Sequence, residues 1–489
     1  RFKDAAWEQG IFFDTLKQSY LLTAQWILDQ TNKAKEELDP HTAHKVAFFT
    51  RQFVDALSPS NFFATNPEAI KKFLETNGGS LARGVDNLLE DIEDGKGNFV
   101  LKMTDDEAFA VGKNLATTPG KVIHRNDLIE LIQYSPTTET VFQKPLLFIP
   151  AWINKYYIAD LTPENSLIRW LVDQGYTVFI ISWANPDSRH REKTFDDYLL
   201  EGPLEALKVI EDATGEKEIT AIGYCLGGTL LGTTQAHLAT KGKSPIAAAT
   251  YLTTMMDFSQ PGDLGVFIDE EQISELEKRM EERGYLEGKE MAGTFNMLRA
   301  NDLIWSFVVN NYLLGKEPFP FDVLYWNSDS TRMPAKMHSF YLRSMYLHNR
   351  LIVPGGLTIA GTPIDLRNIT TPSYFLSTRE DHIAPWMSTY AATQLMKGSS
   401  RFVLAASGHI VGVINPPTKA KYCHWVSEKL PPSPKQWLES ATQVEGSWWP
   451  DWHRWNADFS GGKVPARIPG NGKMKAIEDA PGSYVKARS

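Results

Sequence analysis

A cysteine stands where the chain is expected to turn sharply from a strand into a helix. Residues 218–224 read as a short apolar strand, Cys225 follows within Gly-x-Cys-x-Gly-Gly, and a helix-compatible run extends from residue 229 to about 240. This is the pattern of a nucleophile elbow, where glycines allow tight bending and close backbone approach. A helix N-terminus stabilises a thiolate. Because a thioester stays reactive toward a second nucleophile, cysteine in place of the usual serine indicates acyl transfer rather than simple hydrolysis.

A cysteine nucleophile needs a base and an acid that orients the base. In folds built around such an elbow, the chain order is nucleophile, acid, histidine. Asp381 follows the expected strand 372–377, and His409 lies in a glycine-containing loop after the expected strand 402–405. The order Cys225, Asp381, His409 therefore predicts a catalytic triad.

Two further assignments leave alternatives open. Asp257 also follows an expected strand and rivals Asp381 as the acid, although we favour Asp381. The oxyanion hole is expected to use the backbone N–H of Leu226 and a second N–H from the loop after the first central strand. Ile153 is the first choice for that second donor and Trp152 the second.

The elements around these residues alternate between strand and helix. Expected strands cover 146–149, 177–183, 218–224, 246–253, 372–377 and 402–405, and expected helices cover 165–174 and 195–213. We predict an α/β-hydrolase-type, mostly parallel sheet within a catalytic domain over residues 99–489, with a helical cap insertion at about 258–351. Residues 1–98 predict a mostly helical N-terminal domain, in which Asn66 caps a helix that begins at Pro67.

Other segments are less regular in pattern. Short strands are expected near 99–103 and 122–130, and the tail from 461 to 489, rich in Gly, Pro and Lys, is expected to be irregular. Cys423 reads as a packing residue at a helix start. Four tryptophans within 447–455 are expected to fasten the C-terminal region to the body by aromatic burial.

Composition excludes several classes of protein. The 489 residues are 42% hydrophobic and 22% charged, which is typical of a globular chain. A net charge of −9 argues against nucleic-acid binding. No apolar run approaches the ~20 residues that span a bilayer, and no secretory signal is visible. Two cysteines outside any Cys/His cluster predict neither a disulfide framework nor a metal site, and favour a cytoplasmic protein.

The chain resembles the class I poly(3-hydroxyalkanoate) synthases, which polymerise bacterial storage polyester. The resemblance covers essentially the whole chain and rests on the stretches 62–67, 153–158, 182–187, 223–228, 380–383, 407–417 and 446–451. It implies the same roles for Cys225, Asp381 and His409. It also implies that Trp326, in the expected cap, is linked to formation of a homodimer. Ala151 departs from the pattern, since relatives more often carry a second proline there.

The resemblance further implies an acyltransferase that polymerises (R)-3-hydroxyacyl-CoA and releases coenzyme A through a thioester on Cys225. Coenzyme A then belongs to the substrate, and no separate cofactor is expected. Tyr224 and Leu226 look like the short-chain-preferring class, for which 3-hydroxybutyryl-CoA is the substrate. Implied partners are the growing polyester and granule-coat (phasin) proteins, and the implied location is the surface of cytoplasmic storage granules. The alternative is a cysteine thioesterase or lipase-like hydrolase.

Overall fold

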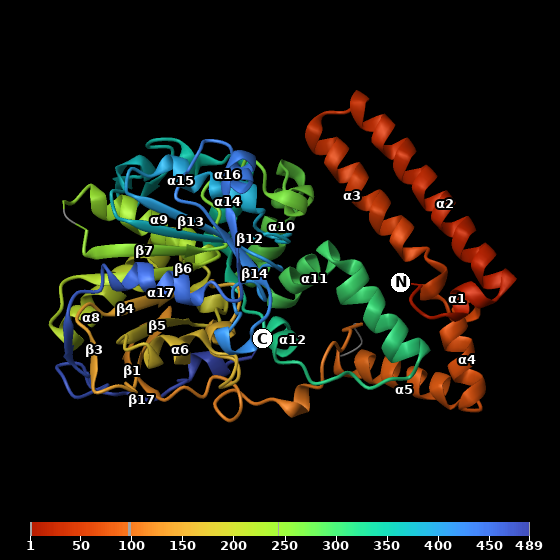
Figure 1. Ribbon diagram of the computed structural model, residues 1–489, viewed down its shortest axis with the longest axis horizontal. Coiled ribbons are helices and arrows are strands. Elements are labelled where there is room, and N and C mark those ends of the chain that lie inside the picture. The colour runs from red at the N-terminus through yellow and green to blue at the C-terminus, as the bar shows by residue number, and fades with distance from the viewer. Residues whose placement is uncertain (1, 96–98, 243, 489) are drawn as a thin grey trace. The chain divides into compact units, whose positions relative to one another are not determined.

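The computed structural model describes residues 2–95, 99–242 and 244–488, and the chain divides into two compact units (Figure 1). One unit comprises residues 1–109 and 291–325, and the other comprises 110–290 and 326–489. Part of the segment expected as a cap therefore packs with the N-terminal helices. A Cβ at Gly84 would lie 1.9 Å from the carbonyl oxygen of Tyr312, so the two backbones meet directly.

The first unit is built from helices. Its N-terminal part contains α1 (Ala6–Gln9), α2 (Ile11–Ala34), α3 (Pro40–Ala56), α4 (Pro67–Glu75) and α5 (Gly79–Asp94). Residues 291–325 add most of α11 (Gly288–Leu298), η9 (Asn301–Trp305), η10 (Val308–Leu313) and the first part of α12 (Asp322–Ser328). The predicted helix start at Pro67 is confirmed, because the Asn66 side chain accepts hydrogen bonds from the N–H groups of Glu68 and Ala69.

The second unit is organised around an eleven-stranded sheet in the order β15-β14-β13-β12-β7-β6-β4-β5-β2-β1-β17. The six strands from β13 to β5 run parallel, and the flanking strands are antiparallel. The parallel strands are β4 (Leu146–Ile149), β5 (Val178–Trp183), β6 (Ile219–Tyr224), β7 (Ile246–Leu252), β12 (Ser373–Thr378) and β13 (Ser400–Ala405). The flanking strands are β1 (Gly120–Arg125), β2 (Ile129–Tyr134), β14 (Cys423–Val426), β15 (Thr442–Glu445) and β17 (Glu478–Asp479).

Strands β4, β5, β6 and β12 are buried at every position because both faces of this part of the sheet are covered. The helices of this unit include α6 (Leu167–Asp173), α7 (Phe195–Leu199), α8 (Glu205–Thr214), α9 (Leu226–Ala239), α10 (Glu270–Arg283), α13 (Ala335–Tyr341), α14 (Trp386–Tyr390), α15 (Ala392–Leu395), α16 (Pro434–Ser440) and α17 (Trp449–Ala457). The mostly parallel sheet that the sequence predicts is present.

Three local predictions are wrong. Residues 99–103 form no strand, whereas the strand structure expected near 122–130 is present as the end of β1 and the start of β2, joined by a turn at 126–128. Residues 195–213 are not one helix, because the π-helical turn η7 (Leu200–Leu204) breaks the run at Gly202 and Pro203. Cys423 begins strand β14 rather than a helix.

The tail is more ordered than its composition indicates. β16 (Lys463–Pro465) pairs with β3 (Thr140–Phe142), and β17 pairs with β1 at the sheet edge. The expected aromatic fastening is present in α17, which crosses the front of the sheet in Figure 1. Trp448, Trp449 and Trp452 are buried, and the Trp452 indole donates to the Thr250 hydroxyl of β7.

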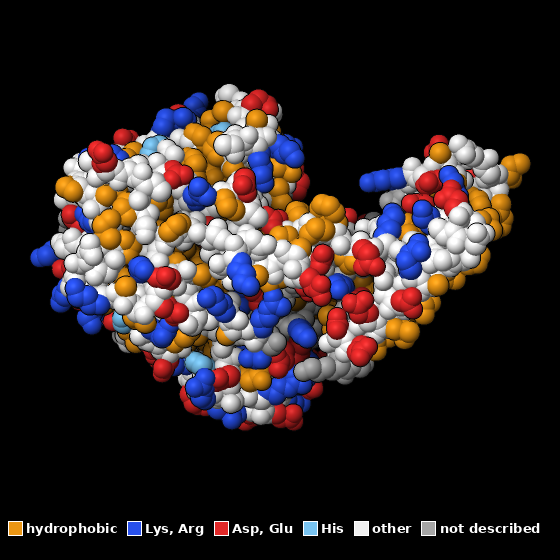
Figure 2. Space-filling view, turned by 90° about the horizontal axis from the view of Figure 1, so that it is seen from below, with side chains coloured by type: hydrophobic (Ala, Val, Ile, Leu, Met, Phe, Trp, Pro, Cys, Tyr) orange, Lys and Arg blue, Asp and Glu red, His pale blue; other side chains and the backbone are white. Residues whose placement is uncertain are grey.

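Charged side chains of both signs are interspersed over the face shown in Figure 2. Within residues 2–95, 99–242 and 244–488, no helix combines the length and the apolar character that a bilayer crossing requires.

Candidate active site

Cys225 occupies a strained turn between β6 and α9. Its backbone has φ 53° and ψ −119°, a conformation that is unusual for a residue with a side chain. The flanking glycines explain how the turn closes. A Cβ at Gly227 would lie 2.0 Å from the carbonyl oxygen of Ile149, and a Cβ at Gly228 would lie 1.9 Å from the Thr254 hydroxyl. The partly exposed thiol is therefore presented at the first turn of α9.

Asp381 and His409 meet beside this turn. The Nδ1 of His409 lies 2.7 Å from Oδ2 of Asp381, and both side chains are buried. The other carboxylate oxygen of Asp381 accepts the N–H groups of Ile383 and Ala384, each at 2.8 Å. These bonds fix the carboxylate, which in turn fixes the imidazole ring. The charge of Cys225 acts on the same imidazole, so the structure brings the three predicted residues into one site.

The charges at the site favour a protonated His409. Burial by itself lowers the pKa of this histidine, but the negative charges of Asp381 and Cys225 outweigh burial and raise the pKa to about 10. The arrangement is a cysteine beside a histidine, with a carboxylate behind the imidazole. Such an arrangement supplies both a nucleophile and a proton donor.

Asp257, the rival acid, lies elsewhere in the hydrogen-bond network. Its Oδ1 accepts from the Asn349 amide at 2.7 Å and from the N–H of Ser259 at 2.9 Å. Asp257 therefore holds the turn at residues 257–259 and binds Asn349. The carboxylate partner of His409 is Asp381.

Tyr224 contacts His409, a positioning role that the sequence did not predict. Its hydroxyl donates to the carbonyl oxygen of His409 at 2.9 Å, and its ring stacks on the imidazole with centroids 5.8 Å apart. Its place next to Cys225 was the one available signal, since His409 is 185 positions away in the chain. Tyr224 holds the histidine from the side of the elbow strand.

The part of the chain that follows residues 291–325 contributes aromatic rings to the surroundings of Cys225. Burial is the main cause that raises the pKa of Tyr341 and of Tyr346, and the charge of Cys225 adds to it in both. The two rings lie 5.6 Å apart, and Phe258 contacts each of them. These three rings form an aromatic wall within electrostatic range of Cys225.

The candidate oxyanion loop, residues 151–155, begins against the elbow. The carbonyl oxygens of Ile149 and Pro150 are the atoms that a Cβ at Gly227 would meet. The carbonyl of Trp152 accepts from the Thr331 hydroxyl. Because C=O and N–H point in opposite directions across a trans peptide, the N–H of Ile153 points away from Thr331. Leu226 begins α9, where backbone N–H groups have no partner within the helix.

Trp326 is buried within the chain. Its indole N–H donates to the carbonyl oxygen of Lys155 at 2.7 Å, so it joins α12 to the candidate oxyanion loop. Across the described ranges, no group of three or more His, Cys, Asp or Glu side chains is suited to a metal ion.

Known proteins match this chain along its whole length. Residues 1–171 match the family described as the N-terminus of poly-beta-hydroxybutyrate polymerase (PhaC), and residues 144–416 match the alpha/beta hydrolase fold family. The chain is 51% identical to a poly(3-hydroxyalkanoate) polymerase from Methylorubrum extorquens, covering all of this chain and 81% of that protein. It is 50% identical to the polymerase subunit PhaC of Rhizobium meliloti, over 100% and 80% of the two chains.

A third relative, the polymerase subunit PhaC of Cupriavidus necator, is 46% identical over 100% of this chain and 83% of its own length. The matches span both units, and the elbow with Cys225, Asp381 and His409 lies inside the hydrolase-fold match. The chain therefore belongs to the poly(3-hydroxyalkanoate) polymerase family, a family of transferases built on the α/β-hydrolase fold.

Proposed function

We propose that this enzyme polymerises (R)-3-hydroxyacyl-CoA into polyester through a thioester on Cys225 and releases coenzyme A. The observation that carries the proposal is the arrangement of Cys225 at its strained turn with His409, whose Nδ1 is bonded to Asp381 and whose pKa is raised by the charges of Asp381 and Cys225. An elbow serine would serve hydrolysis equally well. A thiolate exchanges one thioester for another, a nearly balanced step that conserves the activation of the acyl group.

In the first half-reaction, the thiolate of Cys225 attacks the carbonyl carbon of the substrate thioester. The oxygen becomes an oxyanion, for which the N–H groups of Leu226 and Ile153 are the proposed donors. The C–S bond to coenzyme A then breaks, and the imidazolium of His409 protonates the leaving thiolate. The products are the acyl-enzyme, free coenzyme A and neutral His409.

Acylation also prepares His409 for the second half-reaction. The charge of Cys225 disappears when the thioester forms, and with it one of the two charges that raise the pKa of His409. The neutral imidazole accepts the proton of an incoming 3-hydroxyl group, and the oxygen attacks the thioester. An ester forms, the thiolate of Cys225 leaves, and the ion pair is restored.

The aromatic wall of Phe258, Tyr341 and Tyr346 supports transfer over hydrolysis. Apolar rings over the sulfur disfavour water at the acyl-enzyme, whose hydrolysis would end the chain. Large rings close to the nucleophile also suit a short acyl chain such as 3-hydroxybutyryl. We include that preference in the proposal.

Incubation with 3-hydroxybutyryl-CoA tests the proposal, with coenzyme A release and turbidity followed together. We expect both signals from the native enzyme and from Cys423→Ala, the matched control, whose thiol lies on β14. Cys225→Ala should lose both. Release of coenzyme A with free 3-hydroxybutyrate and no insoluble product would identify a thioesterase instead.

We further propose that the enzyme acts as a homodimer at the surface of storage granules, with coat proteins as neighbours. Trp326 enters this proposal through the family resemblance, and within the chain its indole N–H donates to the carbonyl oxygen of Lys155. Trp326→Ala should shift the mass measured by light scattering toward the monomer at low micromolar concentration. Trp326→Phe, which keeps the packing, should shift it less.

A further inference from the structure

The C-terminal segment Gly482–Ala487, here called the C-terminal clasp, docks on a buried carboxylate at the sheet edge. Glu130 of β2 is fully buried, and it accepts the N–H groups of Ser483 and Tyr484, both at 3.1 Å. The glycine is required, because at φ +83° a Cβ on Gly482 would lie 2.3 Å from Oε2 of Glu130. The clasp is thus fixed at its first residues by main-chain hydrogen bonds to a buried charge.

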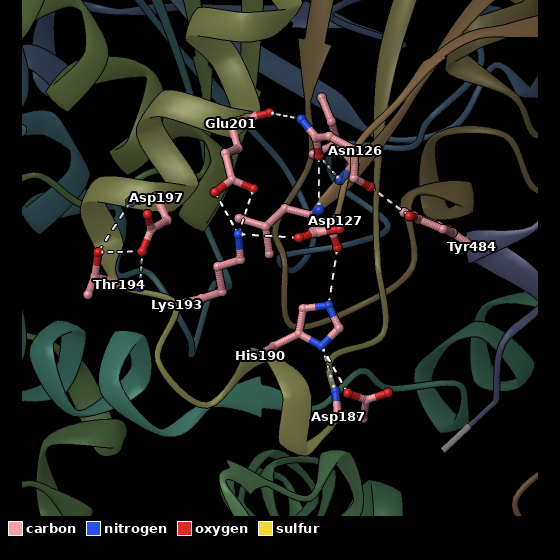
Figure 3. Close-up of polar contacts among 11 residues, drawn as sticks. Asn126, Asp127, Asp187, His190, Lys193, Thr194, Asp197, Glu201 and Tyr484 are labelled. Carbon is pink, nitrogen blue, oxygen red and sulfur yellow. Dashed lines mark hydrogen bonds and ion pairs between the residues drawn. The ribbon is translucent and has the colours of Figure 1, made fainter.

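A polar network connects the loops that the clasp contacts. The Tyr484 hydroxyl donates to the carbonyl oxygen of Asn126, in the turn between β1 and β2 (Figure 3). In the same view, His190 joins Asp187 to the carbonyl of Asp127. The loop after β5 is therefore tied to the same turn that holds the clasp.

The end of the clasp reaches a second buried charge. The ammonium of Lys155, which is 3% exposed, donates to the carbonyl oxygen of Ala487. The Asn185 amide donates to the same oxygen at 3.3 Å. Lys155 ends the candidate oxyanion loop, and Asn185 lies in the loop after β5. One main-chain carbonyl of the clasp therefore links the two loops.

Lys155 and Asn185 also bind residues 326–332, where the chain returns to the second unit after residues 291–325. The Asn185 side-chain oxygen accepts the N–H of Arg332, and the Lys155 carbonyl accepts the Trp326 indole. The carbonyl oxygen of Ile153 also accepts the N–H of Thr331, at 3.0 Å. The oxyanion loop is thus held between residues 326–332 and the clasp.

We propose that the C-terminal clasp, acting through Lys155, positions the oxyanion loop against the elbow, and that Lys155 is a positioning residue for acyl transfer. The inference rests on the proposed function. A shift of about 1 Å in an oxyanion donor costs on the order of 100-fold in rate, so a loop held by one buried lysine is sensitive to that lysine. The nucleophile and His409 make none of these contacts and should keep their own reactivity.

The test compares two reactions of Cys225 in a Cys423→Ala background. Alkylation by iodoacetamide uses the thiolate and develops no oxyanion, whereas acylation by 3-hydroxybutyryl-CoA, measured as coenzyme A release in the first turnover, does. Lys155→Met removes the ammonium and keeps the stem. Gly482→Ala displaces the clasp without altering the loop. Gly446→Ala is the control, since Gly446 has φ +85° but no atom near its Cβ position.

We expect Lys155→Met and Gly482→Ala to slow acylation about 10- to 100-fold while alkylation stays within about twofold. Gly446→Ala should change neither rate. Native-level acylation in Gly482→Ala, or an equal loss of alkylation and acylation, would overturn the clasp proposal alone. Absence of acylation in the parent enzyme would instead overturn the proposed function and the clasp with it.

Discussion

At the scale of single residues, His409 is held from three directions. Asp381 bonds its Nδ1, the ring of Tyr224 covers one face, and the charge of Cys225 acts on it from the elbow. The Tyr224 hydroxyl also holds the main chain of the histidine. The imidazole is therefore oriented before substrate arrives, and orientation that needs no rearrangement lowers the barrier to proton transfer.

Tyr224→Phe should lower kcat by up to about tenfold, because it removes one hydrogen bond worth about 0.5–1.5 kcal/mol while the stacking remains. Steady-state coenzyme A release measures the effect. Tyr251→Phe is the matched control, since Tyr251 is also buried and stacked on Phe375, but its hydroxyl accepts a hydrogen bond from Gln235 instead of holding the main chain of His409. An equal loss of kcat in both variants would assign Tyr224 to general packing.

Asp381→Asn should slow elongation more than the first acylation. The thiolate–imidazolium attraction survives without the carboxylate, whereas proton abstraction from a hydroxyl needs the imidazolium that Asp381 stabilises. Rapid-quench measurement of the first coenzyme A release, compared with steady-state turnover, separates the two steps. Equal losses in both steps would contradict this division of labour.

At the scale of elements, the contact between α9 and β4 decides where the first turn of α9 lies. Gly227→Ala should destabilise the protein and reduce acylation, because the added methyl group meets the carbonyl of Ile149 and displaces the N–H of Leu226. Calorimetry and first-turnover kinetics report the two effects. Gly293→Ala, in α11 with open space around it, should be neutral or stabilising by up to about 1 kcal/mol. A neutral Gly227→Ala would show that α9 moves freely relative to β4.

Helix α17, which follows the candidate catalytic loop in the chain, is hydrogen-bonded to that loop through its first tryptophans. The Trp448 indole donates to the carbonyls of Gly412 and Val413, and the Trp449 indole donates to Val413. These carbonyls follow His409 by three and four residues. The aromatic burial expected from sequence therefore also fixes the loop that carries the base.

At the scale of the whole molecule, a second buried histidine makes stability depend on pH. His338 in α13 is 2% exposed, and within the described chain neither ring nitrogen has a hydrogen-bond partner. Burial lowers its pKa to about 4. Between pH 6.5 and 4, the unfolded chain binds a proton that the folded chain does not, so stability falls as pH falls.

From this histidine we expect a loss of about 2 kcal/mol between pH 6.5 and pH 5. Urea unfolding of the native enzyme and of His338→Gln at both pH values measures it. The variant should lose less stability on acidification, because all other titrating groups are shared. Identical losses would show that the folded protein protonates His338 without cost.

The sequence alone determined the candidate nucleophile and the order of its candidate partners. A strand, a glycine-rich turn and a helix are encoded locally, so Cys225 was visible at the elbow. Asp381 and His409 were found because parallel strands bring their carboxyl ends to one edge of a sheet. Local spacing could not choose between Asp381 and Asp257, since both follow such strands.

Only the tertiary structure decided contacts between residues far apart in the chain. It placed Asp257 on Asn349, stacked Tyr224 on His409, and packed residues 291–325 with the N-terminal helices. It also ordered a tail whose composition predicts irregular structure. The physical reason is that the buried side chains of Lys155 and Glu130 find partners in main-chain atoms of the clasp, and main-chain atoms leave no trace in sequence.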